Sequence, residues 1–160
     1  MKINLDEKNR HIIALLQEDS TLSVKDIAAK IGLSFTPTYE RIKSLEETGV
    51  IQKYVALIDR EKVGLQIAAY CNVTLKEQSR EALLNFEKEA KRIPEITEII
   101  SVSGSYDYML RVIATDIKAY NNFVLEAISN LPNIGHYHSN IILAEVKRET
   151  SYKLPAPEDI

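Results

Sequence analysis

The spacing of hydrophobic residues changes once along this chain, near residue 60, and that change is the strongest constraint on its fold. Before it, apolar residues recur every three or four positions, as in Val24, Ile27 and Ile31, which is typical of amphipathic helices. After it, short runs rich in β-branched and aromatic residues are interleaved with helical patterns. The chain has 160 residues, enough for two small domains, and the change predicts an α+β protein.

Three short helices are predicted in the first fifty residues. Asp6 is the expected N-cap of the first helix, and Ser23 with Asp26 forms a capping box for the second. Gly32 and Gly49 follow the second and third helices, where a left-handed residue is often needed. A turn of about four residues joins the last two helices, which is the helix-turn-helix pattern. A three-helix bundle without a ligand is the alternative reading.

The remainder of the chain is predicted to have the order β-α-β-β-α-β. Two similar stretches, Ile93–Ile96 (IPEI) and Leu131–Ile134 (LPNI), each end a helix and begin a strand, which supports two related halves. This order predicts a ferredoxin-like sandwich, an antiparallel four-stranded sheet with two helices on one face. The predicted strands are 68–75, 96–103, 108–114 and 136–146, and the predicted helices are 79–93 and 117–131.

The domain limits follow from these patterns. We predict a helix-turn-helix domain over 1–50, a linking strand and charged turn over 51–65, a ferredoxin-like domain over 66–150 and a C-terminal tail over 151–160. Residues 51–58 (IQKYVALI) are the expected strand within the linker.

Apolar residues on both faces of the predicted sheet bear on assembly. In one central strand Leu110 and Val112 alternate with Met109 and Ile113, yet two helices can cover only one face. The other face would be a large exposed apolar patch unless a second subunit covered it. The sequence therefore predicts an obligate oligomer with sheet packed against sheet.

Composition excludes several classes of protein. The net charge is −3, but residues 1–63 carry 10 basic and 10 acidic side chains, so only the C-terminal part is a poor partner for phosphate. The chain shows neither an apolar run of membrane-spanning length nor the apolar core of a signal peptide, so we expect a cytoplasmic protein. Its single cysteine, Cys71, is expected to be a buried strand residue.

The order of these motifs resembles that of one known family. The stretch Leu5–Asp59, followed by SGSYDYML, LPNI and the closing EVK…LP, is similar to the Lrp/AsnC (leucine-responsive, "feast/famine") regulators over essentially the whole chain. The resemblance implies a DNA-binding transcriptional regulator with a ferredoxin-like domain that dimerises and often assembles into octamers. It also implies double-stranded DNA and a free amino acid as partners, with no other cofactor.

The third helix is the expected DNA-reading element. Its stripe of Thr38, Ile42 and Leu45 must face the other helices, which leaves the residues around Tyr39 exposed. We expect Pro37 in the first turn, where its missing N–H breaks no helical bond. The predicted DNA-binding residues are Ser34, Thr36, Pro37, Thr38, Tyr39, Arg41, Lys43 and Lys53.

Each of these assignments has a structural alternative. For Arg41 the alternative is an ion pair with Glu46 or Asp26, and for Tyr39 it is a role as a capping aromatic. Glu40 is expected to pair with Lys43 at i, i+3. For Phe35 two readings stay open, exposure beside Tyr39 or packing against the first helix.

The hairpin SVSGSYDYML is the expected effector site. A zwitterionic amino acid needs an acceptor for its ammonium group and donors for its carboxylate, which Asp107 and the Gly104 backbone could supply. The location of the site is implied by the family resemblance, and an ordinary turn capped by Asp107 is the alternative. The predicted effector-binding residues are Gly104, Ser105, Tyr106, Asp107, His138 and Ser139.

Other functions have weaker support in the sequence. His136 and His138 share a strand face but lack a third metal ligand, and the chain has no motif for a nucleophile or a phosphate loop. We therefore expect neither a metal site nor an enzyme. The second candidate is an amino-acid-sensing regulatory module of a metabolic enzyme, which would not need an exposed recognition helix.

Overall fold

The protein is described here by a computed structural model covering residues 5–155. The chain divides into two compact units. The first contains the described residues up to Leu57 together with those from Lys147 onward, and the second is Ile58–Val146. Residues 151–160 are predicted to be a tail, whereas their described part, up to Pro155, belongs to the unit of the N-terminal helices.

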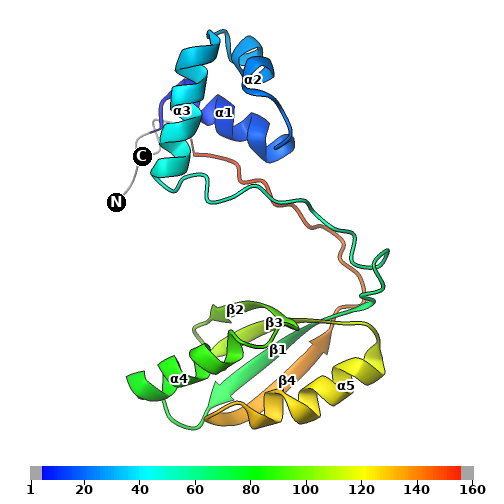
Figure 1. The fold of residues 1–160 in the computed structure, drawn as a ribbon. Helices are drawn as coiled ribbons and strands as arrows, with labels where there is room; N and C mark the ends of the chain where they lie inside the picture. The colour runs from blue at the N-terminus through cyan, green and yellow to red at the C-terminus, as the bar shows by residue number, and fades with distance from the viewer. Residues whose placement is uncertain (1–4, 156–160) are drawn as a thin grey trace. The chain divides into compact units, whose positions relative to one another are not determined.

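The N-terminal unit is built on three helices, α1 (Glu7–Glu18), α2 (Val24–Ile31) and α3 (Phe35–Glu47) (Figure 1). Their apolar stripes meet in one core. Its fully enclosed members include Ile12, Ile27 and Leu45, and Val50 and Ile51 pack against it after α3 ends. The predicted helix-turn-helix arrangement is thus confirmed.

The helix boundaries match the capping residues. The Asp6 carboxylate accepts from Asn9 N at 2.7 Å, and the Ser23 hydroxyl accepts from Asp26 N at 3.2 Å. Gly32, the residue after α2, has φ +68°, a backbone conformation that costs a side-chain-bearing residue free energy. A glycine there lets the chain reverse within three residues and start α3.

The C-terminal segment of the described chain packs on α1. The Gln17 side chain forms two hydrogen bonds with the backbone of Tyr152, at 3.2 and 2.7 Å. Leu154 joins the edge of the helical core, and Arg10 donates to the Pro155 carbonyl. The fold of the N-terminal unit therefore uses residues separated by more than a hundred positions in the sequence.

The second unit is a four-stranded antiparallel sheet with two helices on one face (Figure 1). In chain order its elements are β1 (Ile67–Leu75), α4 (Arg80–Ala90), β2 (Ile96–Ser101), β3 (Tyr108–Ala114), α5 (Ile117–Glu126), the 3-10 turn η1 (Ile128–Asn130) and β4 (Ile134–Ile141). The strands are ordered β2-β3-β1-β4, so the two central strands pair directly. This is the predicted ferredoxin-like sandwich.

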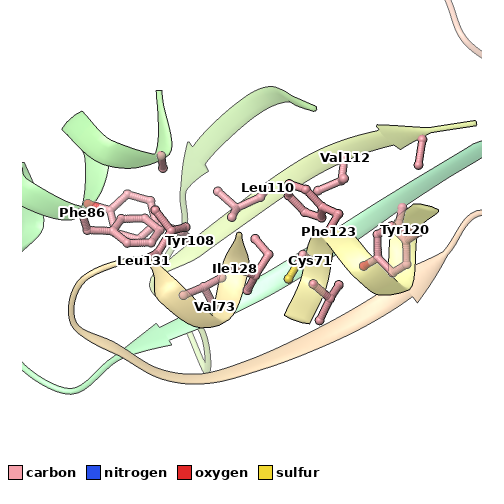
Figure 2. Packing of buried hydrophobic residues seen from close by; sticks show 14 of the residues in the cluster. Cys71, Val73, Phe86, Tyr108, Leu110, Val112, Tyr120, Phe123, Ile128 and Leu131 are labelled. Carbon is pink, nitrogen blue, oxygen red and sulfur yellow. The ribbon is translucent and has the colours of Figure 1, made fainter. Parts of the chain in front are cut away.

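The core of this unit lies between the sheet and its helices (Figure 2). Cys71 and Leu110 face each other across β1 and β3, and both are fully buried. Phe86 of α4 stacks obliquely on Tyr108, with ring centroids 4.8 Å apart. The full burial of Cys71 within β1 confirms the predicted buried strand cysteine, and this burial raises the pKa of its thiol to about 11.

The face of the sheet without helices is more polar than predicted. The register places Tyr70, Asn72 and Thr74 of β1 on that face, beside Arg111 of β3. Met109 and Ile113 do lie there and are half-buried, but Arg111 stands between them. The expected continuous apolar patch is therefore interrupted, because the alternating pattern of β3 includes a charged residue.

Three predicted strands differ by two residues or more from the observed structure, and the one predicted over 96–103 ends at Ser101 as β2. Residues 51–58 belong to no strand, and their backbone forms no ladder with any described residue. The last strand begins at Ile134 and ends at Ile141 instead of running to 146. Its partner β1 begins at Ile67. After the hydrogen bond from Ile142 N to the Ala68 carbonyl, the chain therefore runs past the end of β1 and its pairing with that strand stops.

Candidate nucleic-acid interface and effector loop

The start of α3 is open to solvent. Ser34 is its N-cap, with extended backbone, yet its hydroxyl makes no capping hydrogen bond. Thr36 is exposed and its hydroxyl has no partner among the described residues. Pro37 is the third helical residue, within the first turn as predicted, where a helix leaves N–H groups unbonded. Free donors and hydroxyls therefore gather where the helix dipole attracts an anion.

Two aromatic rings extend this surface along α3. Phe35 and Tyr39 are 56% and 44% exposed, and their rings stack in parallel with centroids 6.2 Å apart. Phe35 thus packs on Tyr39, which favours the exposed of its two readings. Four positions separate the two residues, which brings them one above the other on the helix surface.

The charged residues of α3 form ion pairs other than those expected. Lys43 Nζ lies 3.2 Å from Glu46, one turn later, and not beside Glu40. Arg41 donates to Asp6 at 2.6 Å and to Asn9 at 2.8 Å, joining α3 to the start of α1. The hydrogen bond from Asn9 N, with the contact to Arg41, holds the pKa of the Asp6 carboxyl below its usual value. The ion pair between Arg41 and Asp6 is not apparent from the sequence, because Asp6 lies 35 positions before Arg41.

Thr38 does not belong with the predicted DNA contacts. Its side chain is fully buried, and its hydroxyl donates to the Ser34 carbonyl at 2.9 Å. It fills the apolar stripe of α3 and satisfies its hydroxyl inside the helix. Lys53, in the segment after α3, is exposed and has no ion pair among the described residues.

The predicted effector loop connects β2 to β3. Gly104 has φ +118°, which only glycine adopts readily, and both it and Ser105 are exposed, while Tyr106 is half-buried. The Asp107 carboxylate accepts from Leu75 N at 2.8 Å and from Gln78 Nε2 at 2.9 Å. Asp107 therefore ties the loop to the end of β1, a cap on a neighbouring strand and not on its own backbone.

His138 and Ser139 cannot both line one pocket. They are consecutive in β4, so their side chains point to opposite faces of the sheet. Ser139 lies opposite Cys71 on the helix side, where Tyr120 donates to its hydroxyl at 2.7 Å. His138 lies opposite Asn72 on the other face and is exposed. The prediction that the two complete the effector pocket is wrong.

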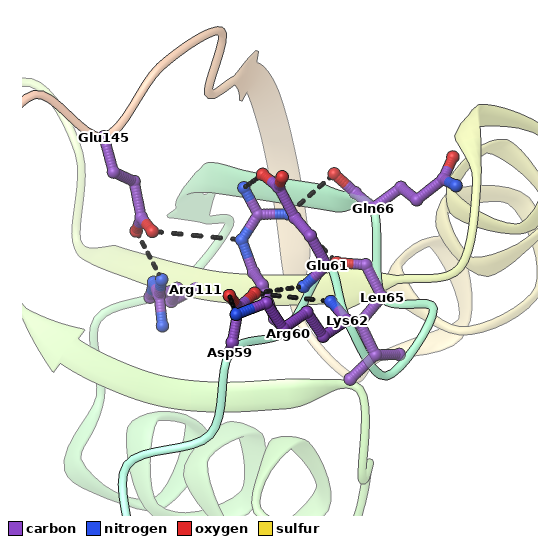
Figure 3. A network of polar contacts seen from close by, with 8 residues as sticks. All are labelled: Asp59, Arg60, Glu61, Lys62, Leu65, Gln66, Arg111 and Glu145. Atoms are coloured by element: carbon purple, nitrogen blue, oxygen red, sulfur yellow. Dashed lines mark hydrogen bonds and ion pairs between the residues drawn. The ribbon is translucent and has the colours of Figure 1, made fainter.

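The structure contains a charged network that the sequence analysis missed (Figure 3). Glu145 lies 2.7 Å from Arg111 and 3.8 Å from Arg60. Arg60 also donates to the carbonyls of Leu65 and Gln66, at 3.0 and 2.6 Å. The charged residue inside the apolar stretch YMLRVIA was the signal for this network, since a mostly buried arginine needs an acidic partner.

Among residues 5–155, no helix has the length and apolar character to cross a bilayer. In the same part of the chain, no group of three His, Cys, Asp or Glu side chains is arranged to hold a metal ion.

Comparison with known proteins matches both units of the chain. Residues 5–52 match the model of a winged helix-turn-helix DNA-binding domain, and residues 68–152 match the Lrp/AsnC ligand-binding domain. A helix-turn-helix in the N-terminal unit removes the support for a sensing module without a DNA-binding role.

Relatives and solved structures agree over nearly the full length. The transcriptional regulator AzlB of Bacillus subtilis is 33% identical, over 94% of this chain and 96% of its own. An AsnC family regulator from Agrobacterium tumefaciens is 38% identical with a TM-score of 0.87, covering 93% of this chain and 97% of its own. The regulator NMB0573 of Neisseria meningitidis, solved as a complex with L-Met, is 29% identical with a TM-score of 0.88, covering 93% and 96%. The chain belongs to the Lrp/AsnC family of DNA-binding transcriptional regulators, whose action a small effector modulates.

Proposed function

We propose that this protein reads its operator with the exposed first turns of α3, and that an amino acid bound beside the loop 102–107 sets its affinity for DNA. The observation that carries the proposal is the solvent-exposed surface of hydroxyl and aromatic groups formed by Ser34, Phe35, Thr36 and Tyr39. In a helix-turn-helix, the N-terminal residues of the second helix contact base edges in the major groove. With DNA as its partner, we place the protein in the cytoplasm.

The roles of the individual residues follow from their exposure. Ser34 and Thr36 supply hydroxyls to a phosphate or a base edge, and the Tyr39 ring packs against a thymine methyl group. Lys43 and Lys53 provide positive charges that contact the phosphate backbone. Pro37 fixes the backbone conformation of the first turn of α3. Arg41 already pairs with Asp6 and Asn9, so its remaining N–H groups make at most a secondary phosphate contact.

Two threonines of α3 offer a matched test. Thr36→Val and Thr38→Val make the same chemical change, at an exposed and at a fully buried position. The probe is a duplex selected from a random-sequence pool by the unaltered protein. We expect Thr36→Val to weaken binding about fivefold, as for one lost hydrogen bond, with stability unchanged. Thr38→Val should lower stability by about 1 kcal/mol and leave affinity unchanged. Equal losses of affinity in both variants would contradict the proposed reading face.

The effector proposal rests on chemistry at the loop 102–107. Gly104 and Ser105 present exposed backbone and a hydroxyl that suit a carboxylate, and Asp107 is the nearest acidic group in sequence. The Neisseria relative, whose structure contains L-Met, supports an amino acid of that kind as the ligand. Each carboxylate oxygen of Asp107 accepts one described hydrogen bond, which leaves lone pairs for an ammonium group.

Asp107→Asn tests this assignment without removing the loop's attachment. The amide oxygen still accepts from Leu75 N, while the negative charge is lost. After a thermal-shift screen over the twenty amino acids has identified the ligand, calorimetry should show binding at least about tenfold weaker in the variant. Unchanged affinity would remove Asp107 from the effector site.

We also propose that the protein acts as a homodimer that assembles further, up to an octamer. Apolar side chains in the segments before β1 and after β4 support it, since Leu143 and Val146 are each 96% exposed and Leu57 and Ile58 are mostly exposed. Surfaces of this kind are normally covered by another chain. Size-exclusion chromatography with light scattering should give at least a dimer at micromolar concentration, and a monomer would refute the proposal.

A further inference from the structure

Glu46, in the last turn of α3, contacts two residues that approach it from different sides. One carboxylate oxygen lies 3.2 Å from Lys43 Nζ, and the other accepts a hydrogen bond from the Tyr54 hydroxyl at 3.0 Å. Tyr54 belongs to the extended segment that follows α3. A single carboxylate thus links that segment to a side chain on the recognition helix.

The contacts continue from Lys43 toward the start of the helix. Lys43 Nζ lies 5.9 Å from the centroid of the Tyr39 ring, within the range of a cation–π interaction. Tyr39 in turn stacks on Phe35 with the ring planes 8° apart. The residues at 35, 39 and 43 are spaced four apart and so form one row on α3. The row runs from the first helical residue to Glu46 and ends on Tyr54.

Tyr54 is 46% exposed, so only part of its side chain is covered by the helices. It lines a cavity of about 300 Å³ together with Leu16, Ile42 and the row residues Tyr39, Lys43 and Glu46. Burial, followed by the bond to Glu46, raises the pKa of the Tyr54 hydroxyl to about 12. The same carboxylate raises the pKa of Lys43. At neutral pH Tyr54 is therefore a hydrogen-bond donor, and Lys43 is a cation.

We propose that Tyr54 is a positioning residue for DNA recognition: through Glu46 it holds Lys43 against Tyr39, so that both side chains meet the duplex already oriented. A free lysine side chain loses roughly 2 kcal/mol of rotamer entropy when it is fixed, and holding it beforehand lowers that cost on binding. This gain in affinity applies only to a DNA sequence whose groups match the oriented side chains of the row. The inference rests on the proposed reading face of α3.

The same contacts make the row depend on the segment after the helix. Tyr54 reaches Glu46 only while residues 51–57 lie along this side of α3. Displacement of that segment breaks the hydrogen bond, loosens Glu46 and frees Lys43 from Tyr39. A change in the position of this segment therefore changes the selectivity of the protein for its DNA sequence, while the net charge of the protein stays the same.

Tyr54→Phe is the direct test, because it keeps the ring in the cavity and removes only the hydroxyl. Tyr152→Phe is the matched control, since Tyr152 is 80% exposed and its hydroxyl has no described partner. Binding is measured on the selected duplex and on a random duplex of the same length. We expect Tyr54→Phe to weaken selected-duplex binding about fivefold, with less than a twofold change on the random duplex, whereas Tyr152→Phe changes neither.

A double-mutant cycle separates positioning from general stabilisation. If Tyr54 acts through Lys43, Tyr54→Phe has no further effect in a Lys43→Met background. Additive losses, or a Tyr54→Phe protein that binds both duplexes like the control, overturn the inference. Should Lys43→Met and Tyr39→Ala both leave selected-duplex binding unchanged, the proposed reading face itself is wrong. Should they weaken it while Tyr54→Phe does not, only the role of Tyr54 is refuted.

Discussion

Glu145→Ala should destabilise the protein far more than its position in an irregular segment suggests. The Arg111 side chain is 11% exposed and that of Glu145 is 27% exposed, and their atoms approach to 2.7 Å. Glu145 is also 3.8 Å from Arg60, whose side chain is 17% exposed (Figure 3). Removing the carboxylate leaves a mostly buried guanidinium group with no described acidic partner.

The expected magnitude lies between two limits. Breaking a fully buried ion pair costs about 3–5 kcal/mol, and exposed pairs are worth about 0.2–1 kcal/mol. Arg111 is close to the first limit, but Glu145 keeps access to water, so we expect a loss of about 2 kcal/mol. For a unit the size of residues 58–146, this corresponds to a fall in melting temperature of about 10 °C.

Urea denaturation at fixed protein concentration is the suitable assay, because guanidinium chloride screens ion pairs and assembly makes stability depend on concentration. Glu149→Ala is the control: Glu149 pairs with Lys147 at 3.0 Å in the same segment, but both side chains are well exposed. We expect its cost to stay below about 0.5 kcal/mol. Arg111→Met in the Glu145→Ala background should restore part of the loss, since it removes the unpaired charge. Equal stabilities of the Glu145 and Glu149 variants would refute the reasoning.

Three further predictions concern pH and the cores. Hydrogen bonds from Asn9 N and Ala119 N lower the pKa values of Asp6 and Asp116 below 3.8, so their stabilisation is present above that pH and is lost as pH falls through the folded-state values. Melting temperatures in acid should therefore drop less in an Asp6→Asn, Asp116→Asn variant, which keeps both acceptors. Phe86→Ala should cost about 3–5 kcal/mol in urea, with Phe86→Leu well below that. The Cys71 thiol, fully buried and with its pKa raised to about 11, should react with an aromatic disulfide reagent only at the rate of unfolding.

Local chemistry in the sequence was enough to predict most elements. Asp6, Ser23 and Gly32 mark helix ends through interactions with residues three or four positions away, and all three do so in the structure. The paired prolines of IPEI and LPNI likewise fall between a helix and a strand. These signals are readable because both partners lie within one turn of the chain.

Contacts between distant residues explain what the sequence analysis missed. Arg41 binds Asp6 across 35 positions, and Arg111 binds Glu145 across 34, so spacing along one helix or strand could not identify either pair. The sequence predicts Ser139 in the effector pocket, but its register opposite Cys71 turns its hydroxyl toward Tyr120. A shift of one residue in the pairing would have exchanged the two faces.

The return of the C-terminal segment to α1 has a consequence for how the protein can be divided. The sheet unit is one continuous stretch, Ile58–Val146, whereas the helical unit is assembled from two separate stretches of chain. In its architecture, the effector-binding unit is thus an insertion within the DNA-binding unit. A fragment ending after α3 would lack the bonds of Tyr152 to Gln17 and the packing of Leu154. Exchange of effector units between relatives should therefore be made at two junctions, with the returning segment kept alongside its own helices.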